Sequence, residues 1–210
     1  QGSFALGTVI KPLDDSDDYD IDLVCHLKTE KSKYTQKEIK TILGEEIKKY
    51  AKANNMSNPP EEGRRCWKMI YASSSGSAGF HLDALPSIGS LSHSEAKQQY
   101  EWYKQTDLFQ INITDNEREN YEKISDDWNV SNPKGYAEWF NSKQQTAITT
   151  ERNNYTRKMM ASGISAKTED VPSYTIKTPL QKAIQFLKRH RDIYFQDNSE
   201  VKPISIIITT

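Results

Sequence analysis

Two carboxylates and a Gly-Ser pair near the start of the chain have the types and spacing of a phosphoryl-transfer site. Residues 19–24 read YDIDLV, an alternation with the period of a strand, so Asp20 and Asp22 are expected on one face. Two carboxylates at such a short distance repel each other unless a hard cation neutralises them. Oxygen ligands of this kind suit Mg²⁺ that carries a substrate phosphate. Upstream, Gly2 allows the backbone to approach a phosphate, and Ser3 offers N–H and hydroxyl donors. The pattern predicts a metal site beside a phosphate site.

A third carboxylate, Asp83, lies in a similar frame. Residues 79–86 read GFHLDALP, which predicts a half-buried strand ended by proline. Three carboxylates on neighbouring strands can hold two metal ions, which clamp the attacking and leaving oxygens of an in-line displacement. One of the carboxylates can also help to deprotonate the attacking hydroxyl.

Composition limits the class of protein. The 210 residues are 35% hydrophobic with a formal net charge of −1, which is consistent with a globular chain of one domain or two lobes and demands no nucleic-acid partner. No run approaches the ~20 apolar residues of a membrane span. Cys25 and Cys66 lie in apolar runs and are expected to be buried free thiols, which together with the absence of a signal peptide predicts a cytoplasmic protein.

Elements around the acidic strands are expected from periodicity. A helix is predicted over residues 35–53, and a strand over 66–72 that joins the acidic strands in a mixed sheet. A further helix is predicted to start at Pro133. Residues 151–173 have no clear period and are expected to form a loop between lobes. His81 and His26 are expected to be structural, because Mg²⁺ prefers oxygen ligands.

The last predicted helix starts at Thr178 and Pro179. Its buried stripe is expected to consist of Leu180, Ala183, Ile184 and Leu187. Cations towards its C-terminal end, including Lys188, are equally consistent with an ordinary solvated helix end, where they favour the helix dipole.

Five segments together resemble one family of enzymes. The Gly2-Ser3 loop, the Asp20-x-Asp22 strand and the Asp83 frame resemble the DNA polymerase β-like nucleotidyltransferases. Within that superfamily, the chain is similar to the bacterial CD-NTases, the cGAS/DncV-like enzymes of CBASS anti-phage operons, through QGSFALGT (1–8), DYDIDLV (18–24), SNPKGY (131–136), LKRHRD (187–192) and KPIS (202–205). The resemblance spans nearly the whole chain.

The resemblance implies a fold and a set of residue roles. The expected fold is α/β (α+β) and two-lobed, with a mixed-sheet catalytic lobe over residues 1–128 and a helical lobe over 129–210. Asp20, Asp22 and Asp83 would be the catalytic metal ligands, while Gly2 and Ser3 would bind nucleotide. Lys188 and Ser205 would contact its triphosphate. Residues 204–210 are β-branched, but the family has a helix there, started by Pro203.

The chain is also expected to be truncated at both ends. It begins on the phosphate-binding motif and stops within an apolar run. In the resembled family a long helix precedes this motif, and further helices follow.

The activity implied is the condensation of nucleoside triphosphates, ATP among them, into a cyclic di- or trinucleotide with release of pyrophosphate. Two Mg²⁺ ions would serve as cofactors, with Mn²⁺ as a substitute. A separate effector would read the product, and CBASS accessory or regulatory proteins are possible partners. No membrane is implied, and DNA is not an obligatory partner.

Two other functions stay open at this stage. A linear oligonucleotide synthase, or a nucleotidyltransferase that modifies a protein or an RNA end, would use the same three carboxylates, so only the product separates it from a cyclase. A non-catalytic nucleotide-binding module is disfavoured because all three acids are present.

Overall fold

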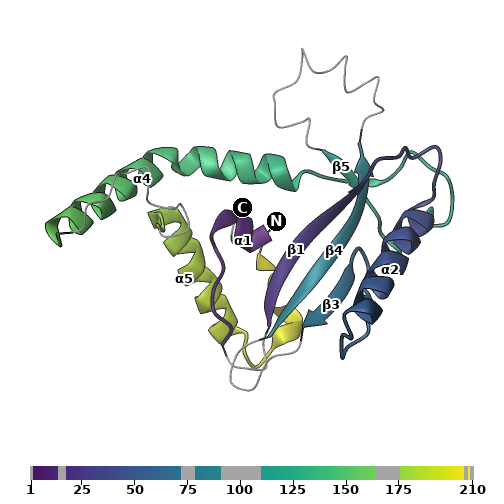
Figure 1. Cartoon of the computed structure of the whole chain (residues 1–210), viewed down its shortest axis with the longest axis horizontal. Helices are drawn as coiled ribbons and strands as arrows, with labels where there is room; N and C mark the ends of the chain where they lie inside the picture. Colours follow the sequence, from purple (N-terminus) through teal and green to yellow (C-terminus); the bar gives the residue numbers. More distant parts are fainter. Residues whose placement is uncertain are drawn as a thin grey trace, which may run out of the picture. The chain divides into compact units, whose positions relative to one another are not determined.

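The computed structural model describes residues 2–13, 18–71, 79–90, 110–163, 176–205 and 208. The chain divides into two compact units (Figure 1). The first consists of Gln1–Gly2 and Asp14–Tyr136, and the second of Ser3–Leu13 and Ala137–Thr210.

A mixed sheet forms the centre of the first unit. Its middle strand, β4 (Phe80–Gly89), pairs in parallel with β1 (Tyr19–Leu27) and antiparallel with β3 (Trp67–Tyr71) (Figure 1). The other strands in the described residues are β2 (Glu61–Glu62), β5 (Ile111–Ile113) and β6 (Asn129–Ser131), each antiparallel to its neighbour. The predicted α+β fold with a mixed sheet is confirmed.

Helix α2 (Gln36–Ala53) packs against β3 and β4. It starts at a capping box, in which the Thr35 side chain accepts from the backbone N–H of Glu38, and the Glu38 carboxylate accepts from that of Thr35. The Trp67 ring lies so close to Gly44 that a Cβ there would be 2.3 Å from it. This close approach lets α2 pack against the core cluster of Ile47, Trp67, Met69 and Ala84.

Ion pairs around the buried Asp115 carboxylate link the segment before β3 to the segment after β5. The fully buried Asp115 carboxylate accepts bonds from Arg64 and Arg65, at 2.8 to 3.0 Å, and from the Asn129 amide at 3.0 Å. Burial by itself raises the pKa of Asp115, but the bonds from Arg64 and Arg65 lower it well below the ordinary value. These ion pairs therefore anchor the segment that leads into β3 at Trp67.

Helices make up the second unit. It contains α5 (Pro179–Tyr194) and the 3₁₀ helix η4 (Ser199–Val201). It also contains α1 (Gly2–Leu6) and α4 (Pro133–Ala161), except for the first residues of these two helices, which belong to the first unit. Side chains of α5 bind the N-terminal segment: Gln181 donates to the Leu6 carbonyl at 2.9 Å, and Gln185 to that of Val9 at 2.6 Å.

Helix starts were predicted correctly, but other features of the helices were not. Pro133 begins α4 and Thr178 caps α5, whereas the loop expected over 151–173 is wrong for residues 151–161, which continue α4. Residues 164–173 lie outside the described residues. On α5, Leu180 and Leu187 are 40% and 50% exposed, while Ile184 and Lys188 are buried.

Towards the end of the chain, Ser205 and Ile208 are helical, which agrees with a helix following Pro203 rather than a strand. Among the helices that the structure describes, none has the length and apolar character needed to cross a membrane.

Candidate active site

The parallel pairing of β1 and β4 brings the predicted carboxylates together. In the register of these strands Asp22 lies opposite Asp83, and Asp20 lies opposite His81. Because side chains alternate along a strand, all four residues project from the same face of the sheet. Two segments some sixty residues apart in the sequence therefore supply one acidic cluster.

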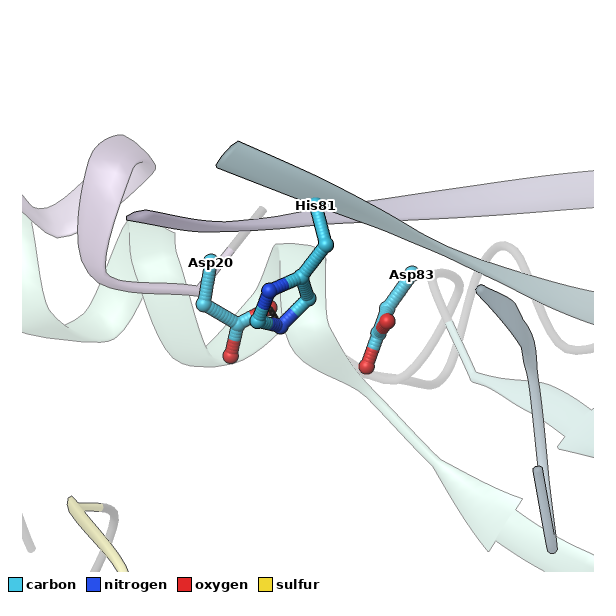
Figure 2. Close-up of side chains that lie close together, drawn as sticks. All are labelled: Asp20, His81 and Asp83. Carbon is cyan, nitrogen blue, oxygen red and sulfur yellow. Dashed lines mark ion pairs between the residues drawn. The ribbon is translucent and has the colours of Figure 1, made fainter. Parts of the chain in front are cut away.

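Asp20, His81 and Asp83 have the spacing of a metal-ligand group. One ligand atom of each lies within 4.8 Å of the others, and Figure 2 shows the three side chains directed to the same region beside the two strands. The Nε2 atom of His81 is 3.3 Å from Oδ1 of Asp20. The Oδ1 atom of Asp83 is buried and has no hydrogen-bond partner among the residues that the structure describes. A buried oxygen without a partner is costly unless a cation or donor completes it.

Electrostatics around this group also favour a cation. Burial, and then the negative charge of Asp83, raise the pKa of Asp20, while His81 and Lys68 lower it by smaller amounts. Burial and the neighbouring Asp83 likewise raise the pKa of the Cys66 thiol to about 11. A positive charge beside Asp20 and Asp83 would remove the repulsion between these carboxylates.

Asp22 has a different neighbour, the backbone of Gly2. A Cβ built on Gly2 would lie 1.7 Å from Oδ2 of Asp22, and Gly2 has a φ of +59°. Only glycine combines this backbone conformation with so close an approach. Gly2 is thus brought against an acidic strand, although Asp22 is not one of the three residues with metal-ligand spacing.

His81 was expected to be a structural residue. The structure places it within the cluster, where it pairs with Asp20. The sequence did indicate that His81 lies beside the acidic residues, because it stands two residues before Asp83 in the same strand and therefore lies on the same face. His26 lies elsewhere on β1, with Nδ1 3.5 Å from the Ser87 hydroxyl.

In the second unit, Thr8 forms hydrogen bonds with Ser3 and with Lys188, two residues that were expected to bind phosphate. The backbone N–H of Thr8 donates to the Ser3 carbonyl at 2.9 Å. Lys188 Nζ donates to both the carbonyl and the hydroxyl of Thr8, each at 3.3 Å. Lys188 is only 3% exposed, so it is not the solvated helix-end cation that its sequence position also allowed.

Ser205, the remaining predicted nucleotide contact, is held by α5. Its hydroxyl accepts a hydrogen bond from Nη1 of Arg191 at 2.7 Å. Lys188 and Arg191 are three residues apart on this helix and therefore lie on neighbouring positions of its surface. Neither Thr8 nor Arg191 was expected to support nucleotide binding, because neither contact has a local signature in the sequence.

Comparison with known proteins shows what this chain is similar to. Residues 1–86 match the family described as "Cyclic GMP-AMP synthase DncV-like, nucleotidyltransferase domain". Over all 210 residues the chain is 30% identical to a protein of Roseivirga ehrenbergii named c-di-GMP synthase. The chain spans 46% of the length of that relative.

Proposed function

Because this chain belongs to the CD-NTase family, we propose that the protein condenses nucleoside triphosphates into a cyclic di- or trinucleotide and releases pyrophosphate. The observation that carries the proposal is the acidic cluster on β1 and β4, in which Asp20, His81 and Asp83 have the spacing of a metal-ligand group. The relative named c-di-GMP synthase supports a cyclic dinucleotide as the product.

The residues of the cluster fit divalent cations. Asp83 offers a buried oxygen that has no hydrogen-bond partner in the described part of the chain, and its charge raises the pKa of Asp20. Asp20, Asp22 and Asp83 would hold two Mg²⁺ ions, for which Mn²⁺ would substitute, since carboxylates suit both metals. When bound, the ions would polarise the reacting phosphate and lower the pKa of the attacking hydroxyl.

The protein's own groups would orient and deprotonate the substrates. A carboxylate of the cluster would accept the proton of the attacking ribose hydroxyl. Gly2 would let the backbone approach the nucleotide. Ser3, Lys188 and Ser205 would contact the triphosphate, with Lys188 supplying the charge that a phosphate needs.

A role in anti-phage defence is part of the proposal and is supported by the family resemblance. A separate effector would read the cyclic product, and accessory or regulatory proteins of a CBASS operon would act on the enzyme. We place the reaction in the cytoplasm, where nucleoside triphosphates are available. The two thiols Cys25 and Cys66 are unpaired, as expected for a reducing compartment.

Pyrophosphate release tests the proposal. The full-length protein is incubated with the four nucleoside triphosphates, with Mg²⁺, with Mn²⁺ or with a chelator, and pyrophosphate is measured. We expect release that requires the metal and is lost in a folded Asp22→Asn variant. Metal-independent release, or unchanged release by this variant, would contradict the assignment of the site. No release by the wild-type protein under any of these conditions would favour a non-catalytic module.

A further inference from the structure

A nearly buried network joins the end of α5 to the segment that contains Ser205. Nη1 of Arg191 donates to the Ser205 hydroxyl at 2.7 Å and to the Pro203 carbonyl at 3.2 Å. The other side of the guanidinium donates to Oδ1 of Asp192, from Nε at 2.9 Å and from Nη2 at 2.5 Å. The side chains of Arg191 and Asp192 are 11% and 12% exposed. The planar guanidinium thus has a fixed orientation.

Asp192 supplies the negative charge that neutralises the cations of this network. Its Oδ1 is also 2.9 Å from Nζ of Lys202. Burial raises the pKa of Asp192, but the hydrogen bonds from Lys202 and Arg191 lower it further than burial raises it. The carboxylate therefore stays ionised and holds two cations, one on α5 and one just before Pro203.

The two hydrogen bonds from Nη1 of Arg191 have different structural roles. The bond from Arg191 to the Pro203 carbonyl anchors the backbone, which any structural arginine could do. The bond to Ser205 reaches the hydroxyl itself, and a hydroxyl that accepts a bond from Nη1 must direct its own O–H away from the guanidinium. The rotation of the Ser205 side chain is thereby restricted before any ligand binds.

We propose that Arg191 is a positioning residue for nucleotide binding, and that it acts through the hydroxyl of Ser205. This inference rests on the proposed function, in which Ser205 and Lys188 contact the triphosphate. Arg191 and Lys188 project from adjacent turns of α5, so the arginine fixes the hydroxyl relative to the helix that also carries the lysine. A pre-oriented donor loses less conformational freedom when the phosphate binds, and affinity increases accordingly.

A double-mutant cycle tests this role. The affinity of the full-length protein for non-hydrolysable α,β-methylene ATP with Mg²⁺ is measured by calorimetry for Ser205→Ala, Arg191→Ala and the double variant. We expect each single variant to bind about tenfold more weakly than wild type. The double variant should be no weaker than either, because both changes remove the same oriented hydroxyl. Lys182→Ala, which removes an exposed cation from the same helix, should bind as wild type does.

Three outcomes would overturn the inference. A roughly hundredfold loss in the double variant would mean that Arg191 contacts the nucleotide independently of Ser205. Wild-type affinity in Arg191→Ala would make the arginine purely structural. If Arg191→Ala does not fold, Arg191→Lys replaces it in the cycle, because lysine keeps the charge but cannot reach Ser205 and Asp192 together; additive losses there would equally contradict the proposal.

The same measurement separates this inference from the function on which it rests. If the wild-type protein does not bind the analogue, and does not bind the corresponding analogues of the other three nucleotides, the proposed function fails and the inference with it. If wild type binds and Lys188→Ala weakens binding, but the cycle is additive, only the role of Arg191 is wrong.

Discussion

Replacing Gly2 by alanine should disable the acidic site through one added methyl group. The Cβ would lie 1.7 Å from Oδ2 of Asp22, whereas an ordinary contact begins at 3.4 Å. The carboxylate or the Gly-Ser backbone must therefore move by about 1.7 Å, the difference between these distances. A misplacement of about 1 Å in a catalytic arrangement can cost on the order of a hundredfold in rate, so we expect at least that loss.

The positive φ of Gly2 adds a second effect that must be separated from the first. An alanine in this backbone region costs about 1–2 kcal/mol wherever it occurs. Gly163 provides the matched control, because its φ is +77° and no atom of the described residues lies within 4 Å of the position of its Cβ. Gly163→Ala should therefore show the backbone cost in thermal unfolding and keep its catalytic rate within about twofold of wild type.

The assay is the initial rate of pyrophosphate release by the full-length protein at saturating nucleotide and Mg²⁺, alongside the thermal midpoint of each variant. Two results would refute the reasoning. If Gly2→Ala keeps more than half of the wild-type rate, its approach to Asp22 is unimportant for the reaction. If Gly163→Ala loses as much activity as Gly2→Ala, backbone strain and not the close approach is responsible.

Three other predictions concern different parts of the chain. Asp20→Asn should abolish pyrophosphate release without loss of fold in circular dichroism, because it removes a metal ligand and relieves repulsion from Asp83; retained release would contradict its role. Lys188→Ala should weaken nucleotide binding by about ten- to a hundredfold in calorimetry, as expected for loss of a charge-assisted phosphate contact, and Thr8→Val should weaken it less, since the Thr8 carbonyl remains to hold the ammonium. Asp115→Asn should reduce the free energy of unfolding in urea by about 1–3 kcal/mol at pH 7, because the carboxylate is buried but Arg64 and Arg65 are about half exposed. Because the folded pKa of Asp115 is lowered, this deficit should be complete above about pH 4 and shrink as the pH falls through the folded pKa; a deficit that does not change with pH would contradict the ion-pair account.

Local patterns were enough to predict the strands that carry the acids. The alternation around Asp20, Asp22 and Asp83 predicts which face each carboxylate occupies, and the register of β1 and β4 confirms that the two segments are neighbours. Helix starts were equally readable, because Thr35 and Thr178 are followed three residues later by Glu38 and Gln181, which complete their capping boxes. These signals lie within a few residues of the structure they specify.

Features that depend on distant residues could not be predicted in this way. Residues 151–161 were expected to be a loop because they lack an apolar stripe, yet they extend a largely polar helix. Leu180 and Leu187 were expected to be buried, but the buried positions of α5 are occupied by Ile184 and Lys188. The burial of Lys188 depends on Thr8, which lies 180 residues away in the sequence and accepts its hydrogen bonds. The pairing of His81 with Asp20 likewise required the strand register.

Product formation over time tests the central claim, that one acidic site joins nucleotides twice to close a ring. The full-length protein is incubated with the four nucleoside triphosphates and Mg²⁺, and samples taken at intervals are analysed by mass spectrometry before and after phosphatase treatment. We predict an early linear species with a 5′-triphosphate that phosphatase degrades, followed by a phosphatase-resistant cyclic product without free ends. Products that stay linear and lengthen with time, or nucleotides transferred only to a protein or an RNA end, would contradict the claim.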